Sequence, residues 1–235
     1  MLLRDAAGGP EVLLLRRKSE LAFYGGAWVF PGGGIDAVDR EPREGEGSGT
    51  AAAGLTLAAR RAAARELREE AGLLLAPEAL SHFAQWLTPP GRTRRFDTWF
   101  FVADAAQLTN TPHQELTLDA GEIDGFRWLT PPAALQARAR KEIELPPPTF
   151  VTLTLLAAHA CVADAIAALR LHAVRDYTPR PCAIEAAGLL VHLYRGDAGF
   201  DTQDPGLAGP RHRLIVRGEN WTYESSELAP QKPVR

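Results

Sequence analysis

The period of the hydrophobic positions changes several times along the chain and predicts strands interleaved with helices. Residues 12–15 form a continuous apolar run, which is typical of a strand buried on both faces. Residues 96–102 place apolar or aromatic side chains on both faces of a strand, after a turn signal at residues 88–91. The predicted strands lie at residues 11–16, 28–30, 80–87, 94–102 and 122–129. A helix is predicted from Pro131 to about Glu142.

A different pattern begins after residues 145–149, where consecutive prolines make a rigid break. Residues 150–171 are apolar nearly all round a predicted long helix, and such a helix is buried. It would pack either against the rest of the chain or at a subunit interface, which would make a homodimer. Short strands are predicted at residues 188–194, 213–217 and 221–224. We therefore predict a domain at residues 1–145 and a carboxy-terminal extension at residues 146–235 that packs on it.

Three acidic residues share one face of a predicted helix. Glu66, Glu69 and Glu70 follow the i, i+3, i+4 spacing. Like charges at this spacing destabilise a helix by about 0.2–0.5 kcal/mol per pair. A hard divalent cation removes this repulsion, because Mg²⁺ and Mn²⁺ prefer oxygen ligands. The helix face therefore predicts a metal site, and the alternative is an acidic face that is merely solvated.

A glycine-rich turn precedes this helix and favours the metal interpretation. The strand at residues 28–30 runs into Pro31, Gly32 and Gly33, whose backbone can approach a ligand closely. Gly72 is a suitable residue to end the helix. The turn lacks the Gly-Lys-Ser/Thr of a P-loop, and the chain has no His-Glu-x-x-His, Cys-x-x-Cys or Gly-x-Ser-x-Gly motif.

The glycine turn and the acidic helix together resemble the Nudix box, G-x5-E-x7-R-E-U-x-E-E-x-G-U, where U is a bulky aliphatic residue. The matching residues are Gly33, Arg65, Glu66, Leu67, Glu69, Glu70, Gly72 and Leu73. Asp39 stands where the family has its first Glu, and it lies 26 positions before Arg65 instead of eight, so 18 residues are inserted. The insert, at about residues 40–57, is rich in Gly, Glu, Pro and Ala and is expected to form a flexible surface loop. A box interrupted in this way is similar to that of the peroxisomal-type coenzyme A diphosphatases.

A second signature of those diphosphatases, LLTxR[SA]x3Rx3Gx3FPGG, is partly present upstream. The residues in register with it are Leu13, Leu14, Arg17, Gly26 and residues 30–33. Leu15 and Ala22 replace its Thr and its second Arg. The resemblance implies an α/β fold, the Nudix α/β/α sandwich with a central mixed sheet. It also implies a small-molecule nucleoside-diphosphate substrate, with coenzyme A or acyl-coenzyme A cut to 3′,5′-ADP and (acyl-)4′-phosphopantetheine.

The resemblance also assigns roles around the metal. It implies that the three acidic residues bind Mg²⁺ or Mn²⁺ together with the backbone carbonyl of Gly32 or Gly33, because the box folds its loop over its helix. Nudix proteins commonly carry a late Glu that assists as a base or outer metal ligand. The candidates here are Glu122 and Glu115.

The expected mechanism follows from the negative charge of a diphosphate, which repels a hydroxide nucleophile. A cation bound at the acidic helix would neutralise phosphate oxygens and lower the pKa of a bound water. Glu66, Glu69 or Glu122 would accept the proton of that water. Arg65 lies four residues before Glu69, so we expect it to orient a carboxylate rather than to contact the substrate.

Arg16, Arg17 and Lys18 form a cationic cluster at the exit of the first predicted strand. Such a cluster commonly belongs to a solvated loop. Beside a metal–phosphate site it would instead bind the anionic groups of a substrate, with bidentate contacts from Arg. We therefore predict that this cluster binds substrate together with the backbone of Gly32 and Gly33.

Composition narrows the classes of function. The chain has 235 residues, 46% of them hydrophobic, and its formal net charge of −3 argues against a nucleic-acid-coating protein. Its start lacks the apolar run of a signal peptide, and no stretch approaches the ~20 apolar residues that span a membrane. Cys161 and Cys182 are too few for a disulfide scaffold, so we expect a cytoplasmic protein.

Three other interpretations stay open. An ADP-ribose or dinucleotide pyrophosphatase acts on the same scissile unit. A non-catalytic Nudix-type ligand sensor would have a degraded box, whereas the three acidic residues are retained here. An interaction protein with a solvated acidic helix would bind Mg²⁺ weakly or not at all.

Overall fold

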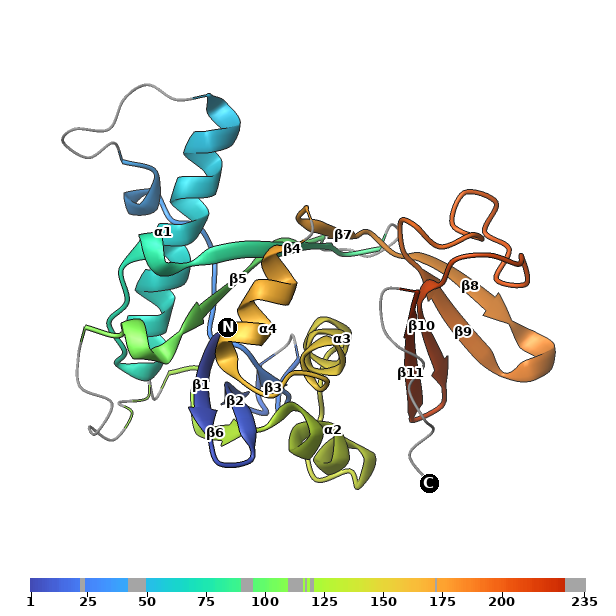
Figure 1. The fold of residues 1–235 in the computed structure, drawn as a ribbon, viewed down its shortest axis with the longest axis horizontal. Helices are drawn as coiled ribbons and strands as arrows, with labels where there is room; N and C mark the ends of the chain where they lie inside the picture. The colour runs from blue at the N-terminus through green and yellow to red at the C-terminus, as the bar shows by residue number, and fades with distance from the viewer. Residues whose placement is uncertain are drawn as a thin grey trace. The chain divides into compact units, whose positions relative to one another are not determined.

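The computed structural model describes residues 1–21, 24–41, 50–89, 95–109, 116, 118, 121–171 and 173–226. The chain forms two compact units (Figure 1). The first consists of Met1–Phe83 and Phe101–Ala173, and the second consists of Ala84–Phe100 and Val174–Arg235. Strands β4 (Ser81–Leu87) and β5 (Asp97–Asp104) each contribute residues to both units.

A mixed sheet forms the centre of the first unit. Besides β4 and β5, its strands are β1 (Leu2–Ala6), β2 (Gly9–Arg17), β3 (Trp28–Val29) and β6 (Ile123–Leu129). The strand order is β3-β2-β1-β5-β4, and β6 pairs with β2. β1 is antiparallel to β2 and parallel to β5, so the predicted mixed sheet is confirmed.

β2 lies inside this sheet. Residues 12–15 have an exposed fraction of 0%, because β1 and β6 pair along the strand and both faces are covered. The continuous apolar run therefore predicted a strand buried on both faces correctly. β1 was not predicted, because only Leu2 and Leu3 are apolar before the charged pair Arg4 and Asp5. Pairing with β2 and β5 makes this short segment a strand.

Helix α1 (Ala51–Ala71) carries the acidic residues, and it begins earlier than expected. The side chain of Thr50 accepts a hydrogen bond from the backbone N–H of Ala53 at 3.2 Å and caps the helix. The expectation of a loop as far as residue 57 is therefore wrong, because residues 51–57 are Ala-rich and helical. Residues 42–49 of the insert lie outside the described residues. Gly72 ends α1 with φ 67°, as predicted.

Helices cover both faces of the central sheet. Figure 1 shows α1 on one side of the sheet and α4 (Val162–Arg170) on the other, where α4 contacts β1 and β2. α2 (Pro131–Ala139) packs against α3 (Pro147–Leu156), and residues 149–156 of α3 are all buried. The predicted helix at Pro131 and the predicted burial after the proline break are both confirmed.

The single helix predicted at residues 150–171 is wrong, because the chain turns and starts a new helix, α4. Cys161 has an extended backbone (φ −148°, ψ 165°), and its sulfur accepts from the N–H of Asp164. The carboxylate of Asp5 accepts the N–H of Val162 at 2.8 Å. This tertiary contact satisfies a donor at the start of α4, and hydrophobic periodicity does not report it.

The second unit is built on a four-stranded antiparallel sheet of order β11-β10-β9-β8. Its strands are β8 (Arg180–Ile184), β9 (Leu189–Leu193), β10 (His212–Arg217) and β11 (Asn220–Ser225). The three strands predicted in the tail are therefore confirmed. β7 (Arg175–Tyr177) pairs with β4, and Tyr177 stacks on Trp86 with ring centroids 4.1 Å apart. The predicted division at residue 145 and the packing of the extension stay predictions.

Within the described part of the chain, no helix is both long and apolar enough to cross a bilayer.

Candidate active site

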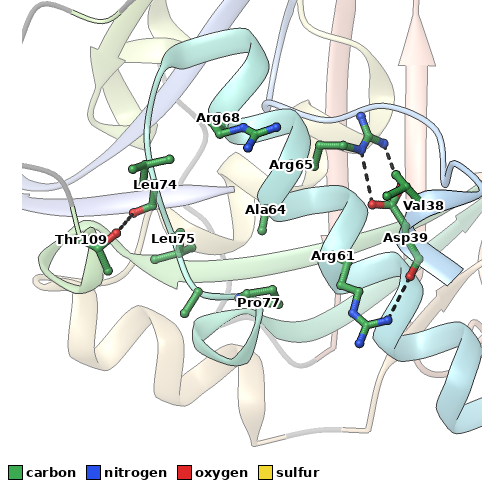
Figure 2. A pocket seen from close by; sticks show the side chains of 11 residues that line it. Val38, Asp39, Arg61, Ala64, Arg65, Arg68, Leu74, Leu75, Pro77 and Thr109 are labelled. Atoms are coloured by element: carbon green, nitrogen blue, oxygen red, sulfur yellow. Dashed lines mark hydrogen bonds and ion pairs between the residues drawn. The ribbon is translucent and has the colours of Figure 1, made fainter. Parts of the chain in front are cut away.

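Arg65 joins the two halves of the interrupted motif. From α1 it donates to the backbone carbonyl of Gly34 at 2.9 Å. It also donates to Asp39 Oδ2 at 3.0 Å (Figure 2). Asp39 lies in the 3₁₀ helix η1 (Val38–Arg40) and is 4% exposed. Its carboxylate also accepts the backbone N–H of Asp36. Burial disfavours the ionised form of Asp39. The hydrogen bonds from Arg65 and from the N–H of Asp36 nevertheless keep the pKa of Asp39 below its usual value.

Arg65 also binds two acidic residues of its own helix. Its Nη1 lies 2.9 Å from Glu66 Oε1 and 2.9 Å from Glu69 Oε2. The hydrogen bond with Asp39 contributes most to raising the pKa of Arg65, and the contacts with Glu66 and Glu69 add to it. One fully charged guanidinium therefore donates hydrogen bonds to three carboxylates and a loop carbonyl, and the carboxylate of Asp36 lies 3.5 Å from it.

Glu70 is tied to the glycine turn. Its Oε2 accepts the backbone N–H of Gly32 at 2.8 Å, and the residue is only 7% exposed. The pKa of Glu70 is raised from 4.5 to about 7, chiefly by burial and in smaller part by the charges of Glu66 and Glu122. The Gly32 hydrogen bond and the charge of Arg17 act in the opposite direction. The carboxylate is therefore poised between its neutral and charged forms near neutral pH.

Gly33 lies against the carboxylate of Glu66. A Cβ atom at position 33 would overlap both Oε atoms of Glu66, so a side chain there would displace the carboxylate or the loop. Burial raises the pKa of Glu66, and Arg65 opposes that rise while the charges of Glu69 and Asp36 add to it. The loop thus folds over the helix, and two helix carboxylates contact consecutive glycines.

The structure separates the members of the cationic cluster. Arg17 Nη2 lies 3.3 Å from Glu122 Oε2, and both charges act on the pKa of Glu70. Arg17 Nε is buried and has no hydrogen-bond partner among the described residues. Arg16 instead pairs with Asp124, and 46% of the Arg16 side chain is exposed. Arg17 and Glu122 are therefore placed at the acidic site, and Arg16 is directed to a different partner.

The family model described as the NUDIX domain matches residues 1–148, which is more than half of the chain. The chain belongs to the Nudix hydrolase family. The predicted family and the predicted α/β Nudix fold are both confirmed. A crystal structure of a NUDIX hydrolase from Alicyclobacillus acidocaldarius is similar, with a TM-score of 0.57 and 25% identity over 71% of this chain and 92% of that one.

Two relatives point to the branch that the interrupted Nudix box resembles. The human acyl-coenzyme A diphosphatase NUDT19 is 30% identical over 67% of this chain and 63% of its own length. The Xenopus laevis protein of the same name is 30% identical over 60% of this chain and 37% of its own length. The chain therefore spans less than two thirds of the length of either relative.

The Nudix acidic residues fit a hard divalent cation in their chemistry. Glu66, Glu69 and Glu70 offer carboxylate oxygens. Burial raises the pKa of Glu66 and Glu70 and the repulsion from neighbouring carboxylates adds to it, and that repulsion would fall if a cation lay among them. Among the described residues, however, no three acidic, His or Cys side chains are gathered as a preformed metal site. Glu69 is turned toward Arg65. The assignment of these residues and of Gly33 as ligands stays a prediction.

Sequence reasoning missed several groups of this site and could not place one candidate. It did not foresee Gly34 and Asp36 as neighbours of Arg65, or Asp124 as the partner of Arg16. Only the charge of Asp36 and Asp124 offered a signal, and charge alone does not identify a partner. Glu115, the second candidate base, lies outside the described residues.

Proposed function

We propose that this Nudix protein hydrolyses the diphosphate bond of coenzyme A or acyl-coenzyme A, giving 3′,5′-ADP and (acyl-)4′-phosphopantetheine. The contact of the Gly32–Gly33 turn with Glu70 and Glu66 carries the proposal, because it unites the two halves of an interrupted box around carboxylates. The names of the relatives, acyl-coenzyme A diphosphatases, support the choice of substrate.

Glu66, Glu69 and Glu70 would hold Mg²⁺ or Mn²⁺, with the carbonyl of Gly33 as a further ligand. The bound cation supplies neutralisation of phosphate charge and a lower pKa for a coordinated water. Arg65 keeps Glu66 and Glu69 oriented from one side of α1. Because Asp39 and Gly34 hold the same guanidinium, Arg65 acts as a positioning residue and not as a substrate ligand.

Arg17 would bind the diphosphate, and Glu122 would accept the proton from the attacking water. The Arg17 side chain is 20% exposed, and one of its buried donors has no partner in the described part of the chain, so it is held near the site with capacity for a further acceptor. Glu122 is 56% exposed, and its single described ion pair with Arg17 is long at 3.3 Å. A carboxylate held this loosely can take up a proton when Arg17 turns to an anionic substrate.

A substrate panel tests the proposal directly. The purified protein is incubated with Mg²⁺ or Mn²⁺ and with coenzyme A, acyl-coenzyme A, ADP-ribose, NADH or diadenosine polyphosphates. Mass spectrometry then identifies the products, and initial rates rank the substrates by kcat/KM. We expect 3′,5′-ADP from coenzyme A or its acyl form at the highest kcat/KM. A low rank for both would overturn the substrate, and no hydrolysis of any compound would overturn the enzyme.

A further inference from the structure

A pocket lies on α1 beside the proposed reaction site, and of the residues given a role there only the positioning residue Arg65 and its partner Asp39 line it. It has a volume of about 570 Å³, is partly open to solvent, and lies between α1, η1, the segment after α1 and Thr109 (Figure 2). None of the acidic ligand candidates, the glycine turn or Glu122 lines it. Its volume falls in the range of roughly 300–1,000 Å³ that small-molecule sites occupy.

The pocket combines an apolar wall with arginine side chains. Leu74, Leu75 and Pro77 form one side, and the carbonyl of Leu74 accepts from the hydroxyl of Thr109 at 3.3 Å (Figure 2). Three arginines of α1, at positions 61, 65 and 68, line the pocket because their spacing places them on one helix face. Asp39 is the one acidic residue among the described lining residues. The described part of the lining thus carries three guanidinium groups and one carboxylate.

Two of these arginines are committed to the protein. Arg61 is 5% exposed and donates to the backbone carbonyl of Glu41 at 2.8 Å and to that of Asp39 at 3.3 Å. Arg65 is held by Asp39 and by the acidic residues of α1. Arg61 therefore contributes fixed positive charge to the wall, whereas the charge of Arg65 is offset by the carboxylates of Asp39, Glu66 and Glu69.

Arg68 is held much more loosely. Its side chain is 60% exposed, and the ion pair with Glu69 is long at 3.6 Å. Glu69 already accepts a shorter hydrogen bond from Arg65 at 2.9 Å, so it competes poorly for a second guanidinium. An arginine in this state can turn to a carboxylate or phosphate and bind both of its oxygens.

We propose that this pocket binds an anionic amphiphile, a phosphate or carboxylate group on a hydrocarbon body. The hydrocarbon packs on Leu74, Leu75 and Pro77, and the anionic group binds Arg68, with Arg61 contributing fixed positive charge to the wall. The site goes beyond the diphosphate hydrolysis and does not rest on it, because Arg68, Leu74, Leu75 and Pro77 have no role in the proposed reaction; the two sites adjoin, since Arg65 lines the pocket and Arg68 lies 3.6 Å from Glu69.

Calorimetric titration of the full chain with hexyl phosphate, hexanoate, hexanol and inorganic phosphate tests the site. We expect the two amphiphilic anions to bind with one-to-one stoichiometry and at least about tenfold more tightly than hexanol or inorganic phosphate. The tighter of the two identifies the preferred head group. Absence of saturable binding by both anions, or equal binding of hexanol, would overturn the proposal.

Matched variants locate the bound ligand. Arg68→Ala should weaken binding about tenfold, whereas Arg140→Ala should leave it unchanged, since Arg140 is similarly exposed at 58% and pairs with Glu142 away from the pocket. Ala64→Phe should fill the pocket and abolish binding. If thermal unfolding shows that this variant does not fold, Ala76→Trp fills the same pocket from an exposed position. Wild-type affinity in a folded filling variant would overturn the assignment.

Discussion

Asp39 and Arg65 are 26 residues apart in the chain, yet Asp39 Oδ2 accepts a hydrogen bond from Arg65 Nη2 at 3.0 Å. The inserted residues leave the Nudix loop and helix in contact, and this pair connects them. Arg65 in turn orients Glu66 and Glu69, so the buried aspartate acts on the site through the arginine.

The first prediction concerns the stability that this pair contributes. Asp39→Asn should lower the free energy of unfolding by about 2 kcal/mol, because a buried charge-assisted hydrogen bond is lost. Urea unfolding measures the change. Asp124→Asn removes the partner of the more exposed Arg16 and should cost no more than about 0.5 kcal/mol. Equal losses in the two variants would contradict a special role for Asp39.

Glu69→Gln and Glu70→Gln should each reduce kcat by on the order of 10²-fold or more, with the fold retained. Gln at position 70 can still accept the N–H of Gly32, so the turn keeps its contact while the ligand charge is lost. Glu142→Gln is the control, since the Glu142 side chain is 51% exposed and forms an ion pair with Arg140 at the surface. Turnover is measured at saturating Mg²⁺ and Mn²⁺, and wild-type turnover in either site variant would refute the metal assignment.

Gly33→Ala should impair turnover by about tenfold or more, because the new methyl group would overlap the carboxylate of Glu66. Gly34→Ala provides a matched comparison, since a Cβ at position 34 meets no atom within 4 Å. Steady-state kinetics, with Mn²⁺ affinity measured in parallel, should separate the two variants. The close packing of Gly33 on Glu66 would be irrelevant to catalysis if both alanine variants behaved alike.

The raised pKa of Glu70 predicts a pH dependence of stability in the absence of divalent metal. Since the pKa rises from 4.5 unfolded to about 7 folded, the buried carboxyl stabilises the fold most below pH 4.5. That contribution is lost as the pH rises from about 4.5 to 7 and amounts to about 3 kcal/mol. Urea unfolding with EDTA between pH 4.5 and 8 measures the slope. Glu70→Gln should flatten it, and an unchanged slope in the variant would disprove the link.

Arg17→Ala should lower kcat/KM by on the order of 10²-fold, because it removes the guanidinium beside Glu70 and Glu122. Arg16→Ala should change kcat/KM much less, since Arg16 is directed to Asp124. The two substituted arginines are neighbours in the sequence, so the comparison tests which of them acts on the substrate. A larger effect from Arg16 would mean that the opposite face of β2 meets the substrate.

Local patterns in the sequence determined a large part of this protein. The apolar run of β2, the positive-φ glycine after α1 and the strands of the tail follow from neighbouring residues alone. The motif around Glu66, Glu69 and Glu70 was readable because helical periodicity places i, i+3 and i+4 on one face. Metal binding, the homodimer and the cytoplasmic location stay predictions.

Only the tertiary structure decided which partners distant groups take. Asp5 caps α4, Asp39 binds Arg65, and Arg17 rather than Arg16 faces the acidic site. These choices depend on burial and on pairing between strands and helices, which impose long-range constraints that no local period encodes. The same reason explains why β1 was missed, since its two leucines form a strand only through pairing with β2 and β5.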